Sequence, residues 1–138
     1  MIAHGPVLPI VLPLATGALL TLLGSGRPRA AALLSVLSAL LSLALAAGLF
    51  VQSGDDTVRV VLLGNWAAPW GIAVALDRLS ALMVLLTAVV GCASLLYALG
   101  GDAARGRHFH ALFHFQWLGL NGAFLTADLF NLFVFFEV

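Results

Sequence analysis

Four long apolar stretches constrain this chain more than any other feature of its sequence. They cover residues 6–23, 30–51, 79–99 and 109–127, and a fifth apolar stretch covers residues 129–138. A helix needs roughly 20 residues, at about 1.5 Å rise each, to cross the hydrocarbon core of a bilayer. The sequence therefore predicts an all-α polytopic membrane protein with four transmembrane helices and the start of a fifth. The first stretch is interpreted as a membrane helix rather than a signal peptide, because no basic segment precedes it.

The composition agrees with a lipid environment and excludes several other classes of protein. Charged residues make up 9% of the chain and hydrophobic residues 62%, whereas a soluble domain is about 25% charged. The net charge is zero, so we expect no basic surface for nucleic acid. The single cysteine, Cys92, allows neither an intrachain disulfide nor a cysteine metal cage. We therefore expect no cofactor and no resident metal, and the lipid bilayer is the first predicted partner.

The segment between the second and third stretches has a different pattern. Two short runs, residues 57–64 and 71–76, are rich in β-branched side chains and lie on either side of the sequence NWAAPW. Such runs around a turn favour a hairpin, and Trp66 and Trp70 suit the boundary between membrane and water. We therefore expect a short β-hairpin-like loop between the second and third helices.

The arginines predict how the helices are oriented in the membrane. Four of them lie in the loops after the first and third stretches: Arg27, Arg29, Arg105 and Arg107. The loop after the second stretch is acidic at its start, with Asp55 and Asp56. Because cytoplasmic loops carry an excess of Lys and Arg, we expect the first and third loops in the cytoplasm and the N-terminus outside.

Glu137 is the acidic residue that is hardest to explain in a purely structural membrane helix. It follows Asp128, a candidate N-cap of the fifth helix, by nine residues, or about 13.5 Å along a helix axis. The hydrocarbon core is about 30 Å thick, which places Glu137 near its middle. An ionised carboxylate costs at least about 2.5 kcal/mol there, and the five stretches contain no Lys or Arg to pair with it. We interpret Glu137 as a proton carrier with a cationic partner beyond these residues; a solvated acid and a structural, hydrogen-bonded acid are the alternatives.

The fourth stretch carries polar side chains on one helical face. His110, His114 and Asn121 fall within about 40° of one another at helical spacing. We interpret His114 and Asn121 as candidate proton relays from the cytoplasmic side, whereas a histidine at the level of the headgroups is the alternative for His110. Two histidines four residues apart without a third ligand do not predict a metal site.

Two further expectations concern local structure. Asp77 either caps the third helix or pairs with Arg78 at the membrane interface. Gly119, Gly122 and Ala123 are small enough to let the fourth helix approach a neighbour closely.

Two stretches resemble the D subunits of the Mrp-type Na+/H+ antiporters: residues 64–90, GNWAAPWGIAVALDRLSALMVLLTAVV, and residues 121–138, NGAFLTADLFNLFVFFEV. That family is similar to the antiporter-like, proton-pumping membrane subunits of complex I. The resemblance implies a longer subunit, of which residues 1–138 form the N-terminal transmembrane region. It also implies that Glu137 matches a glutamate that carries protons together with a lysine of a later helix.

These observations lead to one hypothesis and two alternatives. We expect a transporter subunit that exchanges Na+ or K+ for protons in a bacterial inner membrane, within a hetero-oligomeric complex. The first alternative is a proton-pumping membrane subunit of an NADH-quinone oxidoreductase or a membrane-bound hydrogenase, with the redox chemistry in partner subunits. The second is a membrane assembly or anchoring protein that transports nothing.

Overall fold

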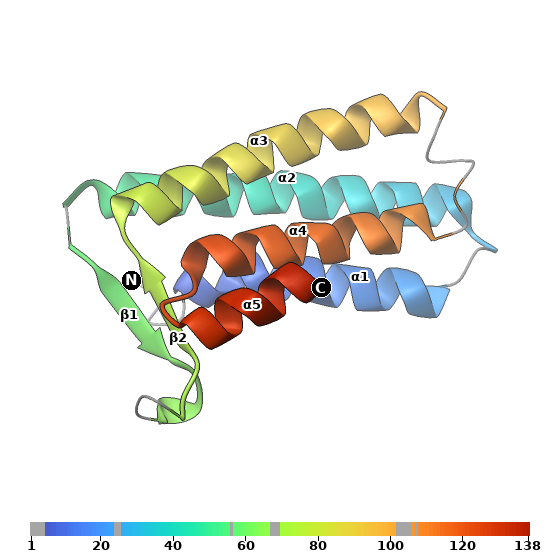
Figure 1. The fold of residues 1–138 in the computed structure, drawn as a ribbon. Helices are drawn as coiled ribbons and strands as arrows, with labels where there is room; N and C mark the ends of the chain where they lie inside the picture. The colour runs from blue at the N-terminus through green and yellow to red at the C-terminus, as the bar shows by residue number, and fades with distance from the viewer. Residues whose placement is uncertain (1–4, 24–25, 56, 67–69, 102–105, 107) are drawn as a thin grey trace.

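A computed structural model describes residues 5–23, 26–55, 57–66, 70–101, 106 and 108–138. Within this part of the chain, four long helices lie side by side and a shorter fifth helix rests on the fourth (Figure 1). The helices are α1 (Leu8–Leu23), α2 (Pro28–Gln52), α3 (Arg78–Leu99), α4 (Phe109–Leu125) and α5 (Leu129–Glu137). The predicted fold class is therefore confirmed.

Three helical segments of the described chain are long and apolar enough to cross a membrane: Gly5–Leu23, Pro28–Asp55 and Arg78–Leu99. The first includes a 3-10 turn, Gly5–Val7, directly before α1. With 17 residues, α4 is shorter than these and about 26 Å long. It packs against both α1 and α3 as a member of the bundle (Figure 1).

The fourth helix ends two residues earlier than the apolar pattern predicts. α4 stops at Leu125, and Thr126 has an extended backbone with φ −69° and ψ 139°. Thr126 pairs with Val74 of the hairpin, and the backbone N–H of Ala127 donates to the carbonyl of Ala73 at 2.9 Å. The N–H of Thr126 still donates to the Gly122 carbonyl of α4, but the N–H of Ala127 donates to the sheet instead. A tertiary contact with the sheet therefore accompanies the end of this helix.

The predicted hairpin is confirmed at one end of the bundle. β1 (Arg59–Leu62) pairs antiparallel with β2 (Ala73–Leu76). A 3-10 turn, Leu63–Asn65, follows β1, and Gly64 takes a φ of 69° that a glycine adopts at little cost. On β2 the side chains of residues 74 and 76 are only 1% exposed, so this strand anchors the hairpin to the helices. Trp66 and Trp70, by contrast, are 66% and 85% exposed.

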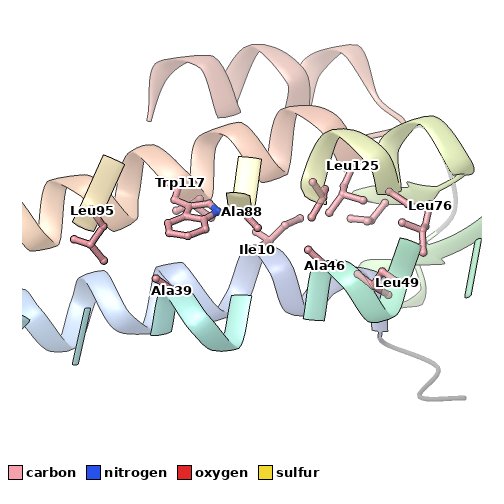
Figure 2. Close-up of a cluster of buried hydrophobic side chains, with 13 residues drawn as sticks. Ile10, Ala39, Ala46, Leu49, Leu76, Ala88, Leu95, Trp117 and Leu125 are labelled. Carbon is pink, nitrogen blue, oxygen red and sulfur yellow. The ribbon is translucent and has the colours of Figure 1, made fainter. Parts of the chain in front are cut away.

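The core is a continuous apolar cluster along the bundle axis. Figure 2 shows Leu95 and Trp117 towards one end of the bundle and Leu49, Leu76 and Leu125 towards the hairpin end. Small side chains fill the middle of this cluster, at Ala39, Ala46 and Ala88. The helices can therefore approach closely along most of their length.

Opposite the hairpin, one end of the bundle holds the last turns of α1 and α3 and the first turns of α2 and α4 (Figure 1). This arrangement agrees with the expectation that both loops face the same side of a membrane. Asp55 pairs with Arg59 at the hairpin end. Three residues of the orientation argument, Asp56, Arg105 and Arg107, lie outside the described residues.

Candidate functional site

Buried polar side chains line the interior between α1, α2 and α4. None of them is more than 5% exposed, and we call this set the polar seam: Thr16, Ser35, Ser38, Ser42, His114 and Asn121. The set combines hydroxyl groups, an imidazole and an amide in surroundings that are otherwise apolar. Buried polar groups of this kind are costly unless they are hydrogen-bonded, so their partners indicate their roles.

His114 is anchored at the centre of the bundle. Its Nε2 lies 2.9 Å from the hydroxyl of Ser35 on α2, and both side chains are 0% exposed. The imidazole also stacks on the indole of Trp117, with the ring centroids 5.9 Å apart and an angle of 2° between the planes. The other ring nitrogen, Nδ1, has no hydrogen-bond partner among the described residues. The imidazole is thus held on one side and has a free nitrogen on the other, as a proton relay requires.

Asn121 has a structural task that the sequence pattern does not reveal. Its Nδ2 donates to the carbonyl oxygen of Pro9 at 2.8 Å. That carbonyl has no helical partner, because the residue four positions later is Pro13, which lacks an N–H. Asn121 therefore supplies from α4 the hydrogen bond that α1 cannot make itself. Its Oδ1 has no partner among the described residues.

The hydroxyl groups of the seam are functional candidates that the sequence analysis does not predict. Thr16 donates to the carbonyl of Leu12 at 2.8 Å and lies 2.8 Å from the hydroxyl of Ser38. The signal was present, however, because Ser35, Ser38 and Ser42 follow the spacing i, i+3, i+7 on one face of α2. Residues 114, 117 and 121 repeat that spacing on α4.

Glu137 lies apart from the polar seam. It is exposed at the end of α5, and within the described residues it makes no hydrogen bond or ion pair with His114 or Asn121. α5 begins at the hairpin end of the bundle and runs back along α4 (Figure 1). A Cβ on Gly119 would lie 2.9 Å from the carbonyl oxygen of Phe135. Glu137 therefore reaches about the level of Gly119, on the other side of α4 from the seam.

Small residues of α4 create this contact, as predicted. A Cβ on Gly122 would lie 2.2 Å from the ring of Phe135, so only a glycine leaves room for this side chain. Similar close approaches bring α1 and α3 onto α4: Gly17 meets Phe115 and Gly91 meets Trp117. The position of α5 thus depends on the absence of side chains on one face of α4.

The two acidic residues at helix starts are caps. The Asp77 carboxylate accepts from the backbone N–H of Ser80 at 2.7 Å and from its hydroxyl at 2.6 Å, and the Ser80 side chain in turn accepts from the backbone N–H of Asp77. These bonds from Ser80 lower the pKa of Asp77 below its ordinary value of 3.8. Asp128 accepts from the backbone N–H of Phe130 at 2.9 Å. Of the two expectations for Asp77, the cap is confirmed, while Arg78 lies 5.7 Å over the ring of Phe50.

His110 lies one turn before His114 on α4. His110 packs its ring edge-on against Phe109 at 5.3 Å, and its Nδ1 has no partner among the described residues. No three His, Cys, Asp or Glu side chains of the described chain come together as ligands for a metal ion.

Known proteins resemble this chain over nearly its full length. It is 46% identical, over 98% of its residues, to the probable K(+)/H(+) antiporter D subunit of Rhizobium meliloti (strain 1021), and covers 26% of that protein. It is 39% identical, over 96% of its residues, to the Na(+)/H(+) antiporter D subunit of Alkalihalophilus pseudofirmus, and covers 27% of it. A third relative is the N subunit of the NADH-quinone oxidoreductase of Desulforudis audaxviator, 35% identical over 100% of the chain and 28% of that protein. No protein-family model matches the chain.

Solved structures of membrane complexes contain chains with a similar fold. The Mrp complex from Dietzia sp. DQ12-45-1b contains a chain with a TM-score of 0.87 and 30% identity, covering 98% of this chain and 25% of that one. The membrane-bound sulfane sulfur reductase, an archaeal respiratory membrane complex, gives a TM-score of 0.79 and 27% identity over 96% of this chain and 28% of that one. The resemblance to the Mrp-type D subunits is therefore confirmed. The apolar helices and these relatives identify a multi-pass membrane protein that spans about a quarter of the length of its relatives.

Proposed function

We propose that this chain, which resembles the antiporter D subunits from end to end, is part of a subunit that exchanges a monovalent cation for protons. The observation that carries the proposal is the 46% identity to a K(+)/H(+) antiporter D subunit over 98% of the chain. A relative named for Na(+)/H(+) exchange is 39% identical, so Na+ and K+ are both candidate substrates. In this proposal residues 1–138 are the N-terminal transmembrane region, with the N-terminus outside a bacterial inner membrane, and other subunits complete the complex.

In this proposal Glu137 binds and releases the transported proton. It is exposed on α5, and an ionised carboxylate facing hydrocarbon costs at least about 2.5 kcal/mol. A cationic side chain from beyond the described residues would stabilise the ionised form, and protonation would release that side chain. A change of charge within the membrane then alters the water and helices around it.

His114 and Asn121 are proposed as relays of a proton path that leads from the cytoplasmic face towards the level of Glu137. His114 has one nitrogen bonded to Ser35 and a second that is unpaired among the described residues. Asn121 has its nitrogen committed to Pro9 and only its Oδ1 unpaired, so it would act by accepting a hydrogen bond from a water molecule. His114→Gln should therefore slow cation-dependent proton flux without loss of the complex, while a flux equal to that of the wild type would remove His114 from the path.

The decisive experiment replaces Glu137 with Gln in the complete complex. We expect proton flux driven by Na+ or K+, measured with a pH-sensitive dye in inverted membrane vesicles, to fall to background. The complex should still migrate intact on a native gel, because Gln has nearly the same shape. Flux that persists undiminished would contradict the proposal.

The matched control is Asp128→Asn, the same carboxylate-to-amide change nine residues earlier. Asn caps helices about as well as Asp, and Asn131, which donates to the second Asp128 oxygen at 2.7 Å, can turn its amide to present an acceptor instead. We therefore expect α5 to keep its start and the flux to stay within about twofold of the wild type. Loss of flux in both variants would mean that α5 responds to any lost charge and that Glu137 has no special role.

A second candidate function is supported by the similarity to the N subunit of an NADH-quinone oxidoreductase and to a respiratory membrane complex. In that case proton movement would depend on a reductant rather than on a cation gradient. Vesicles supplied with NADH or a reduced quinone, with and without Na+ or K+, distinguish the two. Proton uptake that requires the reductant and ignores the cations would favour the respiratory function.

A further inference from the structure

Four buried polar atoms in and beside the polar seam have no hydrogen-bond partner among the described residues: His114 Nδ1, Trp117 Nε1, Ser42 Oγ and Asn121 Oδ1. Their side chains are at most 5% exposed. Roughly nine in ten buried polar atoms in native structures have a partner. Four such atoms in one interface, next to pairs that are well formed, therefore call for a common explanation.

The four atoms lie on α2 and α4, which run in the same direction through the bundle (Figure 1). The bond between Ser35 and His114 sets their relative position. Ser42 follows Ser35 by seven residues, and Asn121 follows His114 by seven, so both lie about 10.5 Å further along. Seven residues are nearly two full turns, so each faces the same way as the first member of its pair.

Trp117 lies between these two levels. Its indole nitrogen is on the side of the ring that faces Ala88 and Ile10, away from Leu95 (Figure 2). The N–H therefore points along the bundle towards the level of Asn121 and Ser42, and not back towards the end that holds Leu95. A Cβ on Gly91 would lie 2.9 Å from this indole, so the ring has little room to turn.

The chemistry of the four atoms is complementary to water. The indole N–H only donates, the Asn121 oxygen only accepts, and the Ser42 hydroxyl and the His114 nitrogen can take part in either sense. A buried water molecule needs two to four polar partners, typically about three. We propose that the polar seam binds a short file of water molecules between the levels of His114 and Asn121. The Trp117 indole donates to this file, the Asn121 oxygen accepts from it, and Ser42 bridges the two.

This inference does not depend on the proposed antiport. It rests on unpaired atoms in the interface of three helices, and it would hold equally for a respiratory or an assembly protein. In an antiporter the same file would connect His114 to the level of Asn121, so its loss would also slow proton flux.

The test measures the transfer of magnetisation from water protons to the indole nitrogen of Trp117. The complete complex, labelled with 15N-tryptophan in lipid membranes, is studied by water-edited solid-state NMR, and Trp117→Phe identifies the signal. We expect the rate of transfer to the Trp117 indole to lie within about twofold of the rate to the exposed indoles of Trp66 and Trp70. The reason is that a water molecule of the file accepts a hydrogen bond from the Trp117 N–H directly. Transfer no faster than to the backbone amide of Trp117 would mean a dry interface and would overturn the proposal.

Ser42→Ala tests whether the hydroxyl is part of the file. It should slow the transfer to the Trp117 indole at least about twofold, because one of the partners of the water is lost. The matched control is Ser94→Ala, the same change on the exposed face of α3, which should leave the transfer unchanged. Fast transfer that is insensitive to Ser42→Ala would place the water elsewhere and would also overturn the proposal.

Discussion

The polar seam and α5 both carry polar side chains in an apolar bundle, but these side chains differ in burial and in hydrogen bonding. In the seam, His114 and Asn121 are buried and bonded to residues of two other helices of the same chain. On α5, Glu137 is exposed, and the helix that carries it has nine residues and packs mainly on α4. The hydrogen bonds of the seam are thus formed within this chain, whereas the described residues form none with the exposed side chain of Glu137. Changes in the seam should therefore affect stability, and changes at Glu137 should affect transport.

The largest effect on stability is expected where α5 meets α4. In Gly122→Ala the added methyl group would lie 2.2 Å from the ring of Phe135. Overpacking of this kind typically costs about 1–3 kcal/mol, and α5 would be displaced together with Glu137. We expect a lower thermal stability of the purified complex and a reduced cation-dependent flux.

Gly48→Ala is the matched control for this substitution. A Cβ at Gly48 would have no atom within 4 Å, and replacing a glycine in the interior of a helix stabilises it by about 0.5–1 kcal/mol. The two changes should therefore shift the unfolding temperature in opposite directions. Equal shifts would mean that the packing of Phe135 against α4 is not what positions α5.

The bond between Asn121 and Pro9 gives a test with an internal rescue. Asn121→Leu leaves the Pro9 carbonyl buried without a partner, which costs about 1–3 kcal/mol. Pro13→Ala restores an N–H four residues after Pro9, so that α1 can satisfy the carbonyl itself. The double variant should therefore lose less stability than Asn121→Leu alone, when unfolding is followed by circular dichroism.

The rescue also separates the two roles proposed for Asn121. If Asn121 only satisfies the Pro9 carbonyl, the double variant should recover both stability and proton flux. If its Oδ1 also takes part in the relay, stability should return and the flux should stay low. Failure of Pro13→Ala to restore stability would contradict the structural role.

Local pattern predicted most of the fold. The apolar stretch 30–51 corresponds to α2 at Pro28–Gln52, and 79–99 corresponds to α3 at Arg78–Leu99. The end of α4 could not be placed from the sequence, because it depends on pairing between Thr126 and the distant Val74. Apolar length and capping are local properties of a sequence, whereas this pairing exists only in the assembled bundle.

The candidate site was predictable to the same extent. Helical spacing correctly placed His114 and Asn121 on one face of α4. Their partners, Ser35 and Pro9, lie 79 and 112 residues away, and no local pattern pairs residues at such distances. The cationic partner expected for Glu137 stays a prediction, because no Lys or Arg side chain of the described residues pairs with it.

The smallest predicted effect is at the start of α3, where the cap is local and well solvated. Asp77→Ala removes the carboxylate half of the capping box, the bonds from the Ser80 N–H and hydroxyl, and should cost about 0.5–2 kcal/mol. Because the bonds from Ser80 lower the pKa of Asp77 below 3.8, the charged cap stabilises the folded state above about pH 4, and this contribution is lost as the pH falls through the lowered pKa. Asp77→Asn keeps a capping side chain without the titration. The stability of the wild type relative to this variant, measured by thermal unfolding, should therefore decrease between about pH 6 and about pH 3. A difference that is the same at both pH values would show that the charge of Asp77 adds nothing to the cap, and that a neutral capping side chain starts α3 equally well.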